Sequence, residues 1–192
     1  RGRSGVIGVN IVAIANQKGG VGKTTTAINL SACVAAYGRR TLIIDLDPQG
    51  NTTSGLGIDK NTKRPAIYDV LINRIPLQDA VTPTPMKGLS IAPANISLAG
   101  AEVELVSEIA REYFLKRALA EVKDEFDDVF IDCPPALGLL TLNALAAADK
   151  LLVPIQCEFF ALEGLTDLMS TVALVHKHLN PNLAVEGVVM TM

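Results

Sequence analysis

Residues 16–26 read NQKGGVGKTTT and combine glycine, lysine and threonine at a spacing suited to phosphate chemistry. Glycine permits positive φ and close approach, so successive backbone N–H groups can point at one anion. A helix that follows the loop would add the partial positive charge of its N-terminus, and Lys23 would place a full charge at the β- and γ-phosphates. Thr24 would supply a hydroxyl ligand for Mg²⁺, and Thr25 would supply a hydrogen-bond donor toward the α-phosphate. The predicted nucleotide-binding residues are Lys18, Gly19, Gly20, Val21, Gly22, Lys23, Thr24 and Thr25.

The stretch departs from the standard phosphate loop, G-x-x-x-x-G-K-[ST], at its first glycine. Gln17 stands there, and a second lysine, Lys18, precedes the glycine pair. Two ammonium groups crowded on the same side of one triphosphate would repel each other. Taken alone, Lys18 could be simply an exposed lysine on the loop.

Three aspartates follow predicted strands and could serve a magnesium nucleotide. Asp45 and Asp47 occur in LIIDLDPQGN, and Asp132 occurs in VFIDCPP. Ligands of an open α/β sheet bind at the carboxyl ends of its strands, so these side chains should converge near Lys23 and Thr24. Each aspartate taken alone could equally be a turn residue or a helix cap.

The predicted metal-binding set is Thr24, Asp45 and Asp132, because Mg²⁺ prefers oxygen ligands and keeps several waters. Asp132, beside the rigid Pro134–Pro135 turn, suits the orientation of metal-bound water, and Asp47, on a loop with proline and glycine, suits positioning of the attacking water. Together with the two lysines these give the predicted catalytic residues, which are Lys18, Lys23, Asp47 and Asp132.

Short apolar runs alternate with longer segments of helical period, which predicts an α/β fold with a mainly parallel central sheet and helices on both faces. Polar stretches 50–65 and 82–88 are predicted to be surface loops. The predicted strands are 10–15, 41–45, 89–93, 129–132, 151–154 and 185–190, and the predicted helices are 22–37, 67–71, 102–106, 111–122, 139–147 and 162–179.

Length and composition fit one globular domain that works in a reducing compartment. The chain has 192 residues, 49% of them hydrophobic and 4% aromatic, and it contains no apolar run of roughly 18 residues. Its three cysteines include no C-x-x-C pair, and Cys133 is predicted to be a small core residue. A net charge of −3 gives no overall case for nucleic-acid binding. Residues 1–9 are predicted to be a flexible leader or expression remnant, and residues 10–192 a P-loop ATPase domain.

Four segments in order, KGGVGKTTTAINL, DLDPQGNTTSGLG, IDCPPALGLLTLNAL and VPIQCEFFALEGL, resemble the deviant Walker A ATPases of the ParA/Soj type. These proteins partition chromosomes and plasmids. The resemblance implies that Lys18 is the signature lysine, which contacts phosphates bound by the other subunit of an ATP sandwich dimer. It also points to Gln156 and Glu158, in a neighbouring loop, as further site candidates.

The resemblance further implies the cofactors ATP and Mg²⁺ and weak ATP hydrolysis that a ParB-type centromere-binding partner stimulates. It implies an ATP-dependent homodimer, non-specific DNA binding by the full-length protein, and a cytoplasmic protein that associates with the nucleoid when ATP is bound. Membrane binding is not expected. Family members usually continue beyond the strand that ends this chain, so the family's C-terminal elements, with adenine contacts and many DNA-binding basic residues, are expected to be missing here.

Two alternatives share the phosphate loop. A MinD-type membrane-associated ATPase has the same signature lysine and needs an amphipathic C-terminal helix. A metabolic ligase or kinase would need a pocket for a second substrate, for which the sequence shows no set of residues. The sequences DLDPQGN and EFFALEGL favour a partitioning ATPase over these alternatives.

Overall fold

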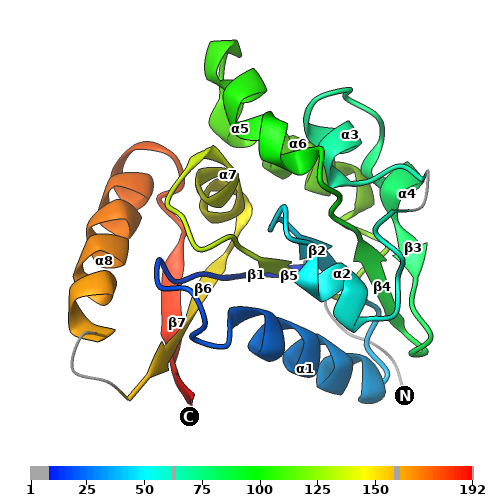
Figure 1. Ribbon diagram of the computed structural model, residues 1–192, viewed down its shortest axis with the longest axis horizontal. Coiled ribbons are helices and arrows are strands. Elements are labelled where there is room, and N and C mark those ends of the chain that lie inside the picture. The colour runs from blue at the N-terminus through cyan, green and yellow to red at the C-terminus, as the bar shows by residue number, and fades with distance from the viewer. Residues whose placement is uncertain (1–8, 62–63, 158–160, 192) are drawn as a thin grey trace.

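The computed structural model describes residues 9–61, 64–157 and 161–191. Their central element is a seven-stranded sheet in the order β3-β4-β2-β5-β1-β6-β7 (Figure 1). Neighbouring strands are parallel except β3, which pairs antiparallel with β4. The strands are β1 (Asn10–Ile14), β2 (Thr41–Asp45), β3 (Thr82–Pro83), β4 (Leu89–Ala92), β5 (Asp128–Asp132), β6 (Lys150–Gln156) and β7 (Ala184–Thr191).

Helices cover both faces of the sheet, so the α/β prediction is confirmed. One face packs on α1, whose Ala27 lies in a cluster with Val12 and Ile43. The opposite face carries the larger cluster, to which α3 to α8 contribute. The helices are α1 (Lys23–Ala36), α2 (Asn51–Gly55), α3 (Ile67–Leu71), α4 (Leu77–Ala80), α5 (Leu98–Glu104), η1 (Leu105–Ser107), η2 (Arg111–Tyr113), α6 (Phe114–Val122), α7 (Leu139–Ala147) and α8 (Ala161–His178).

The apolar runs become central strands because both of their faces are covered. In β2, Ile43 packs into the α1 cluster, whereas Leu42 and Ile44 pack into the larger cluster on the other face. A strand with helices on each side needs apolar residues at every position rather than at alternate ones. Among the described residues, no helix is both long and apolar enough to cross a membrane.

The strand register places the predicted carboxylates side by side. Asp45 at the end of β2 is aligned with Asp132 at the end of β5, and Asp132 is aligned in turn with Ile14 of β1. The segment that follows Ile14 is the glycine-rich loop. The carboxyl ends of three neighbouring parallel strands thus bring loop and carboxylates to one edge, as such sheets do for their ligands.

Two short elements contradict the predicted loops, a third element lies where none was predicted, and two predicted helices differ in extent from the observed ones. Stretch 50–65 begins with α2, α4 was not predicted, and stretch 82–88 begins with β3. Predicted helix 102–106 is the end of α5 continued by η1, and 111–122 opens with the 3₁₀ turn η2 before α6. Helix α2 has the sequence NTTSG, which lacks strong helix formers, so contacts made after folding decide its conformation.

Candidate functional site

The glycine-rich loop between β1 and α1 is fixed at its start by Asn16. This buried side chain donates from Nδ2 to the Pro154 carbonyl of β6, with 2.7 Å between the atoms. Its Oδ1 accepts the backbone N–H of Lys18 at 3.0 Å. Asn16 therefore ties the loop to the neighbouring strand and sets the direction in which the loop leaves β1.

Two further side chains hold the middle of the loop. Gln156 donates from Nε2 to the Gly20 carbonyl at 3.0 Å, and Thr191 donates from Oγ1 to the Val21 carbonyl at 2.7 Å. Gly22, which caps α1, has a φ of +87°, and a Cβ there would lie 3.3 Å from Cγ2 of Thr191. The positive φ favours glycine at this position, and a Cβ would in addition crowd the Thr191 side chain.

Lys23 and Thr24 begin α1 and face the edge of the sheet. The Lys23 side chain is buried, and its Nζ donates to the Lys18 carbonyl at 2.9 Å. Burial lowers the pKa of Lys23, and the charges of Asp132, Cys133 and Asp47 oppose that shift. The structure thus supplies a desolvated ammonium group with carboxylates nearby, a setting in which electrostatic attraction to phosphate is strong.

Asp132 carries an oxygen that suits a hydrated cation. Its Oδ2 accepts hydroxyl hydrogen bonds from Thr24 at 2.8 Å and from Thr52 at 2.6 Å. Its Oδ1 is buried and accepts no hydrogen bond from the residues that the structure describes. Burial raises the pKa of Asp132, and the two hydroxyl donors oppose that shift. A buried oxygen without a donor costs free energy, and magnesium or its bound water would remove that cost.

Asp45 is engaged differently. Its Oδ2 accepts the backbone N–H and the hydroxyl of Thr53 at 2.8 and 2.7 Å, and its Oδ1 accepts the N–H of Asp47 at 3.2 Å. Burial raises the pKa of Asp45 to about 7, against the lowering effect of these donors. Each oxygen of Asp45 already accepts a hydrogen bond, so Asp45 holds α2 and the Asp47 turn in place.

A cavity of about 380 Å³ lies between the glycine-rich loop and the Asp47 turn. Asp47 lines it, and the Asp47 side chain accepts the N–H of Gln49 at 2.9 Å, which fixes the turn. Lys18, Val21, Asp45 and Asp132 do not line the cavity, and Val21 is buried. The lining residues are Gly19, Gly20, Gly22, Lys23, Thr24, Thr25, Asp47, Gln49, Asn51 and Pro135.

Sequence reasoning missed several residues of this site. Thr52 and Thr53 of α2 were assigned to a surface loop, yet both are fully buried against Asp132 and Asp45. Thr53 also accepts the N–H of Ala94 at 3.0 Å, which joins α2 to the end of β4. No feature of the string NTTSG distinguishes buried threonines from exposed ones. Candidate Glu158 lies outside the described residues.

Cys133 beside the site is buried, as predicted, and burial raises the pKa of its thiol. A raised pKa keeps a thiol protonated at neutral pH, so it is a poor nucleophile. Among the described residues, no group of three or more His, Cys, Asp or Glu side chains is placed to hold a metal ion. A cation here would rely on Thr24, phosphate oxygens and waters oriented by carboxylates.

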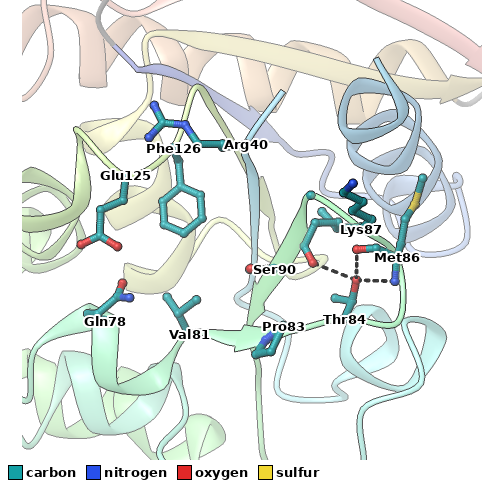
Figure 2. Close-up of a pocket in the computed structure, with 12 residues that line it drawn as sticks. Arg40, Gln78, Val81, Pro83, Thr84, Met86, Lys87, Ser90, Glu125 and Phe126 are labelled. Atoms are coloured by element: carbon teal, nitrogen blue, oxygen red, sulfur yellow. Dashed lines mark hydrogen bonds between the residues drawn. The ribbon is translucent and has the colours of Figure 1, made fainter. Parts of the chain in front are cut away.

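A larger cavity, of about 490 Å³, lies at the opposite edge, near the amino ends of β2 and β4 (Figure 2). The lining residues are Arg40, Gln78, Val81, Pro83, Thr84, Met86, Lys87, Gly88, Leu89, Ser90, Glu125 and Phe126. The Arg40 guanidinium is already engaged by Asp127 Oδ1 at 2.8 Å and by the Asp124 carbonyl at 3.0 Å. This larger cavity lacks the glycine-rich loop and the hydroxyl–carboxylate contacts that are found at the other edge of the sheet. The smaller cavity is therefore the better candidate site.

Comparison with known proteins identifies the family of this chain. Residues 9–185 match the AAA domain family. The chain is 56% identical to the sporulation initiation inhibitor protein Soj of Bacillus subtilis, over 95% of this chain and 72% of that protein. It is 55% identical to the chromosome partitioning protein ParA of Myxococcus xanthus, over 95% of this chain and 64% of that protein.

The chain belongs to the Soj/ParA family. Among solved structures, a cobyrinic acid a,c-diamide synthase from Mycobacterium smegmatis with a bound ATP analogue and magnesium matches with a TM-score of 0.92. It is 44% identical, over 95% of this chain and 74% of that one. The expected cofactors, ATP and Mg²⁺, agree with the ligands of this neighbour. The chain thus spans about two thirds to three quarters of the length of these relatives.

Removing the Thr53 hydroxyl tests whether the buried hydrogen bonds hold this Soj/ParA site together. Thr53→Ala leaves Asp45 one donor short and the Ala94 N–H without its acceptor, so we expect a loss of about 2 kcal/mol in the free energy of unfolding. Thr53→Ser should restore most of it, and Ser54→Ala, at an exposed position of the same helix, should change it by less than about 0.5 kcal/mol. Urea denaturation measures all three, and equal effects of Thr53→Ala and Ser54→Ala would contradict the assignment.

Proposed function

We propose that this chain is the nucleotide-binding part of an ATP-dependent switch that binds and slowly hydrolyses MgATP and drives chromosome or plasmid partitioning. The observation that carries the proposal is the cavity in which the glycine-rich loop, Lys23 and Thr24 meet the Asp47 turn, with Asp132 hydrogen-bonded to Thr24. Membership of the Soj/ParA family supports the cellular role. The cavity supports the chemistry.

The chain's own residues account for triphosphate binding. Backbone N–H groups of the glycine-rich loop and the start of α1 would hold the β- and γ-phosphates, with Lys23 as the buried positive charge. Thr24 and Asp132 would hold the magnesium ion, Thr24 directly and Asp132 through bound water. When bound, Mg²⁺ neutralises phosphate charge and favours transfer of the γ-phosphoryl group to water. Lys23 would exchange its contact with the Lys18 carbonyl for a phosphate oxygen.

Asp47 would position the attacking water, because Asp47 lines the same cavity as Lys23 and Thr24. Gln49 and Asn51 line the same side and are further candidates for contact with that water. Asp45 would act indirectly, by fixing the Asp47 N–H and the start of α2. Slow hydrolysis suits a switch, because the bound γ-phosphate then keeps the protein in its ATP-bound conformation until hydrolysis occurs.

Lys18 would act on a second subunit. Its N–H and carbonyl are used within the loop, and the residue does not line the cavity beside it. We propose a homodimer that encloses ATP, in which Lys18 reaches phosphates held by the other copy. In the full-length cytoplasmic protein, this dimer would bind DNA non-specifically on the nucleoid, and a ParB-type partner would stimulate hydrolysis.

A second candidate function comes from the neighbour named as a cobyrinic acid a,c-diamide synthase, at 44% identity. An amide-forming enzyme would use the same phosphate loop to activate a carboxylate and would need a second pocket beside the γ-phosphate. The lining of the described cavity consists of phosphate-loop and Asp47-turn residues plus Pro135, which favours attack by water. ATP hydrolysis without any added carboxylate or amine distinguishes the two functions.

Thr52→Val tests the positioning of Asp132 for magnesium. The change keeps the side-chain volume but removes a hydroxyl that Asp132 accepts at 2.6 Å. We expect the Mg²⁺ concentration that half-saturates binding of a fluorescent ADP analogue to rise about tenfold, as for other residues that orient metal ligands. Thr52→Ser should behave as the unmodified protein. An unchanged Mg²⁺ requirement in Thr52→Val would mean that Thr24 alone orients Asp132.

Variants at Asp47 and Lys18 test hydrolysis and dimerisation separately. Asp47→Ala should keep ATP binding and lower turnover about a hundredfold, because the attacking water loses its acceptor. Lys18→Ala should bind ATP but fail to dimerise in sedimentation experiments with ATP. Lys116→Ala, at an exposed position of α6, is the matched control. It should neither lower ATP turnover nor prevent ATP-dependent dimerisation. Persistence of ATP-dependent dimers in Lys18→Ala would make Lys18 an ordinary surface lysine.

Pelleting assays with the full-length protein test the proposed role directly. We expect ATP, and not ADP, to cause co-sedimentation with DNA, and added salt to weaken it because phosphate contacts release counterions. Parallel assays use vesicles of anionic lipid. Sedimentation with vesicles but not with DNA would overturn the proposal in favour of a membrane-associated, MinD-type ATPase.

A further inference from the structure

The glycine-rich loop leaves β1 with different neighbours on its two sides. In the sheet, β6 and β7 lie on one side of β1, and β5 and β2 lie on the other (Figure 1). The candidate cavity is on the β2 side, because residues that follow β2 and β5, Asp47 and Pro135 among them, line it. Loop carbonyls that are held by β6 and β7 therefore point away from the cavity.

Two successive loop carbonyls are held in this way. Gln156, the last residue of β6, donates from Nε2 to the Gly20 carbonyl at 3.0 Å. Thr191, the last residue of β7, donates from Oγ1 to the Val21 carbonyl at 2.7 Å. Gln156 and Thr191 are aligned partners in the parallel ladder, so their side chains stand on the same face of the sheet. One pair of neighbouring side chains thus holds two consecutive peptide groups of the loop.

The geometry of the peptide group then sets the direction of two N–H groups. A peptide is planar and trans, so its carbonyl and its N–H point in opposite directions. Because the Gly20 carbonyl is directed at β6, the N–H of Val21 is directed to the other side of the loop, and the Val21 carbonyl directs the N–H of Gly22 in the same manner. Neither N–H donates to the backbone or a side chain in the described part of the chain. Both are available to an anion in the cavity.

The two glycines explain why the loop needs donors from outside. Gly20 has a φ of +75° and Gly22 a φ of +87°. Glycine adopts positive and negative φ about equally readily, so the peptide groups beside these residues can rotate and turn a carbonyl toward the cavity. A carbonyl oxygen there would repel phosphate. Gln156 and Thr191 oppose this rotation, because it would break their hydrogen bonds.

A bulge in β7 brings Thr191 into line with Gln156. The ladder between β6 and β7 begins in regular register and then shifts by one residue at Glu186. Glu186 is exposed, and its carboxylate pairs with Nζ of Lys150 at 2.9 Å. Without the shift, Gln156 would be aligned with Met190, whose side chain has no hydrogen-bond donor. Bulges beside active sites commonly re-aim a side chain in this way.

We propose that Gln156 and Thr191 are positioning residues for the phosphates of the nucleotide, and that they act through the loop backbone. They keep the N–H groups of Val21 and Gly22 directed at the cavity before the nucleotide arrives, which lowers the cost of binding. Neither Gln156 nor Thr191 lines the cavity, so neither needs to touch the nucleotide. The role rests on the proposed ATPase function and adds to it the parts of β6 and β7 that shape the phosphate site.

Variants of the full-length protein test this role in nucleotide binding. Thr191→Val keeps the side-chain volume and removes the hydroxyl, and Gln156→Met keeps the side-chain length and removes the amide. We expect each to raise the Kd of a fluorescent ADP analogue about tenfold, the weight of one hydrogen bond. Thr191→Ser keeps the hydroxyl and should bind as the unmodified protein does. Binding of inorganic pyrophosphate, measured by displacement of the analogue, should weaken by the same factor, because the effect lies on the phosphates.

Turnover separates positioning from a general loss of structure. The loop N–H groups hold phosphates in the ground state and the transition state alike, so both variants should raise the KM for ATP about tenfold and change kcat by less than about twofold. Thr171→Val is the matched control, because the Thr171 hydroxyl also donates to a backbone carbonyl, that of Asp167 at 3.1 Å, but within α8. It should leave Kd and KM unchanged. Circular dichroism checks that all variants are folded.

Several results would overturn the proposal. Unmodified protein that binds ADP with the same Kd as Thr191→Val and Gln156→Met would remove the positioning role and leave the proposed function intact. A fall in kcat at unchanged KM would show that the pair acts on the chemical step instead. A lower free energy of unfolding with unchanged Kd and KM would make the pair purely structural. Unmodified protein that binds neither ADP nor pyrophosphate would overturn the proposed ATPase function, and the positioning role with it.

Discussion

Burial of two carboxylates at the end of the parallel sheet is the constraint on which the rest of this structure depends. Asp45 and Asp132 end neighbouring strands in register, and both are almost fully buried. Buried charge is costly unless hydrogen bonds or opposite charges compensate it. Threonine hydroxyls from α1 and α2, together with backbone N–H groups, supply that compensation. The need to satisfy these two side chains fixes the elements that surround the cavity.

The compensation is complete at Asp45 and incomplete at Asp132. Asp45 accepts three hydrogen bonds and acts as a structural anchor for α2. Asp132 receives both of its hydroxyl bonds on one oxygen, so the other is buried without a donor from the described residues. The contrast explains how two similar aspartates can differ in role: one stabilises the fold, and the other is available to a hydrated cation.

The same hydrogen bonds give the site a means of communication. Thr52 and Thr53 are adjacent in α2 and bind different aspartates, and Thr53 continues to Ala94 ahead of α5. A movement of the Asp47 turn would therefore either move α2 and the segment before α5 as well, or break a buried hydrogen bond. Buried networks of this kind tend to have discrete arrangements, which is what the proposed nucleotide-dependent switch would require.

The amino-acid sequence by itself determined the α/β class, most strand positions, the glycine-rich loop and the family. Those features are local or repeat at short intervals: apolar runs bounded by turns, and glycine, lysine and threonine at fixed spacing. It could not identify α2, whose NTTSG sequence has weak helix propensity, nor Asn16, Thr52, Thr53 and Thr191 as parts of the site. Their partners lie 8 to 170 positions away along the chain. Only the tertiary structure decided which polar residues are buried against which carboxylate or carbonyl, because that depends on strand order and register.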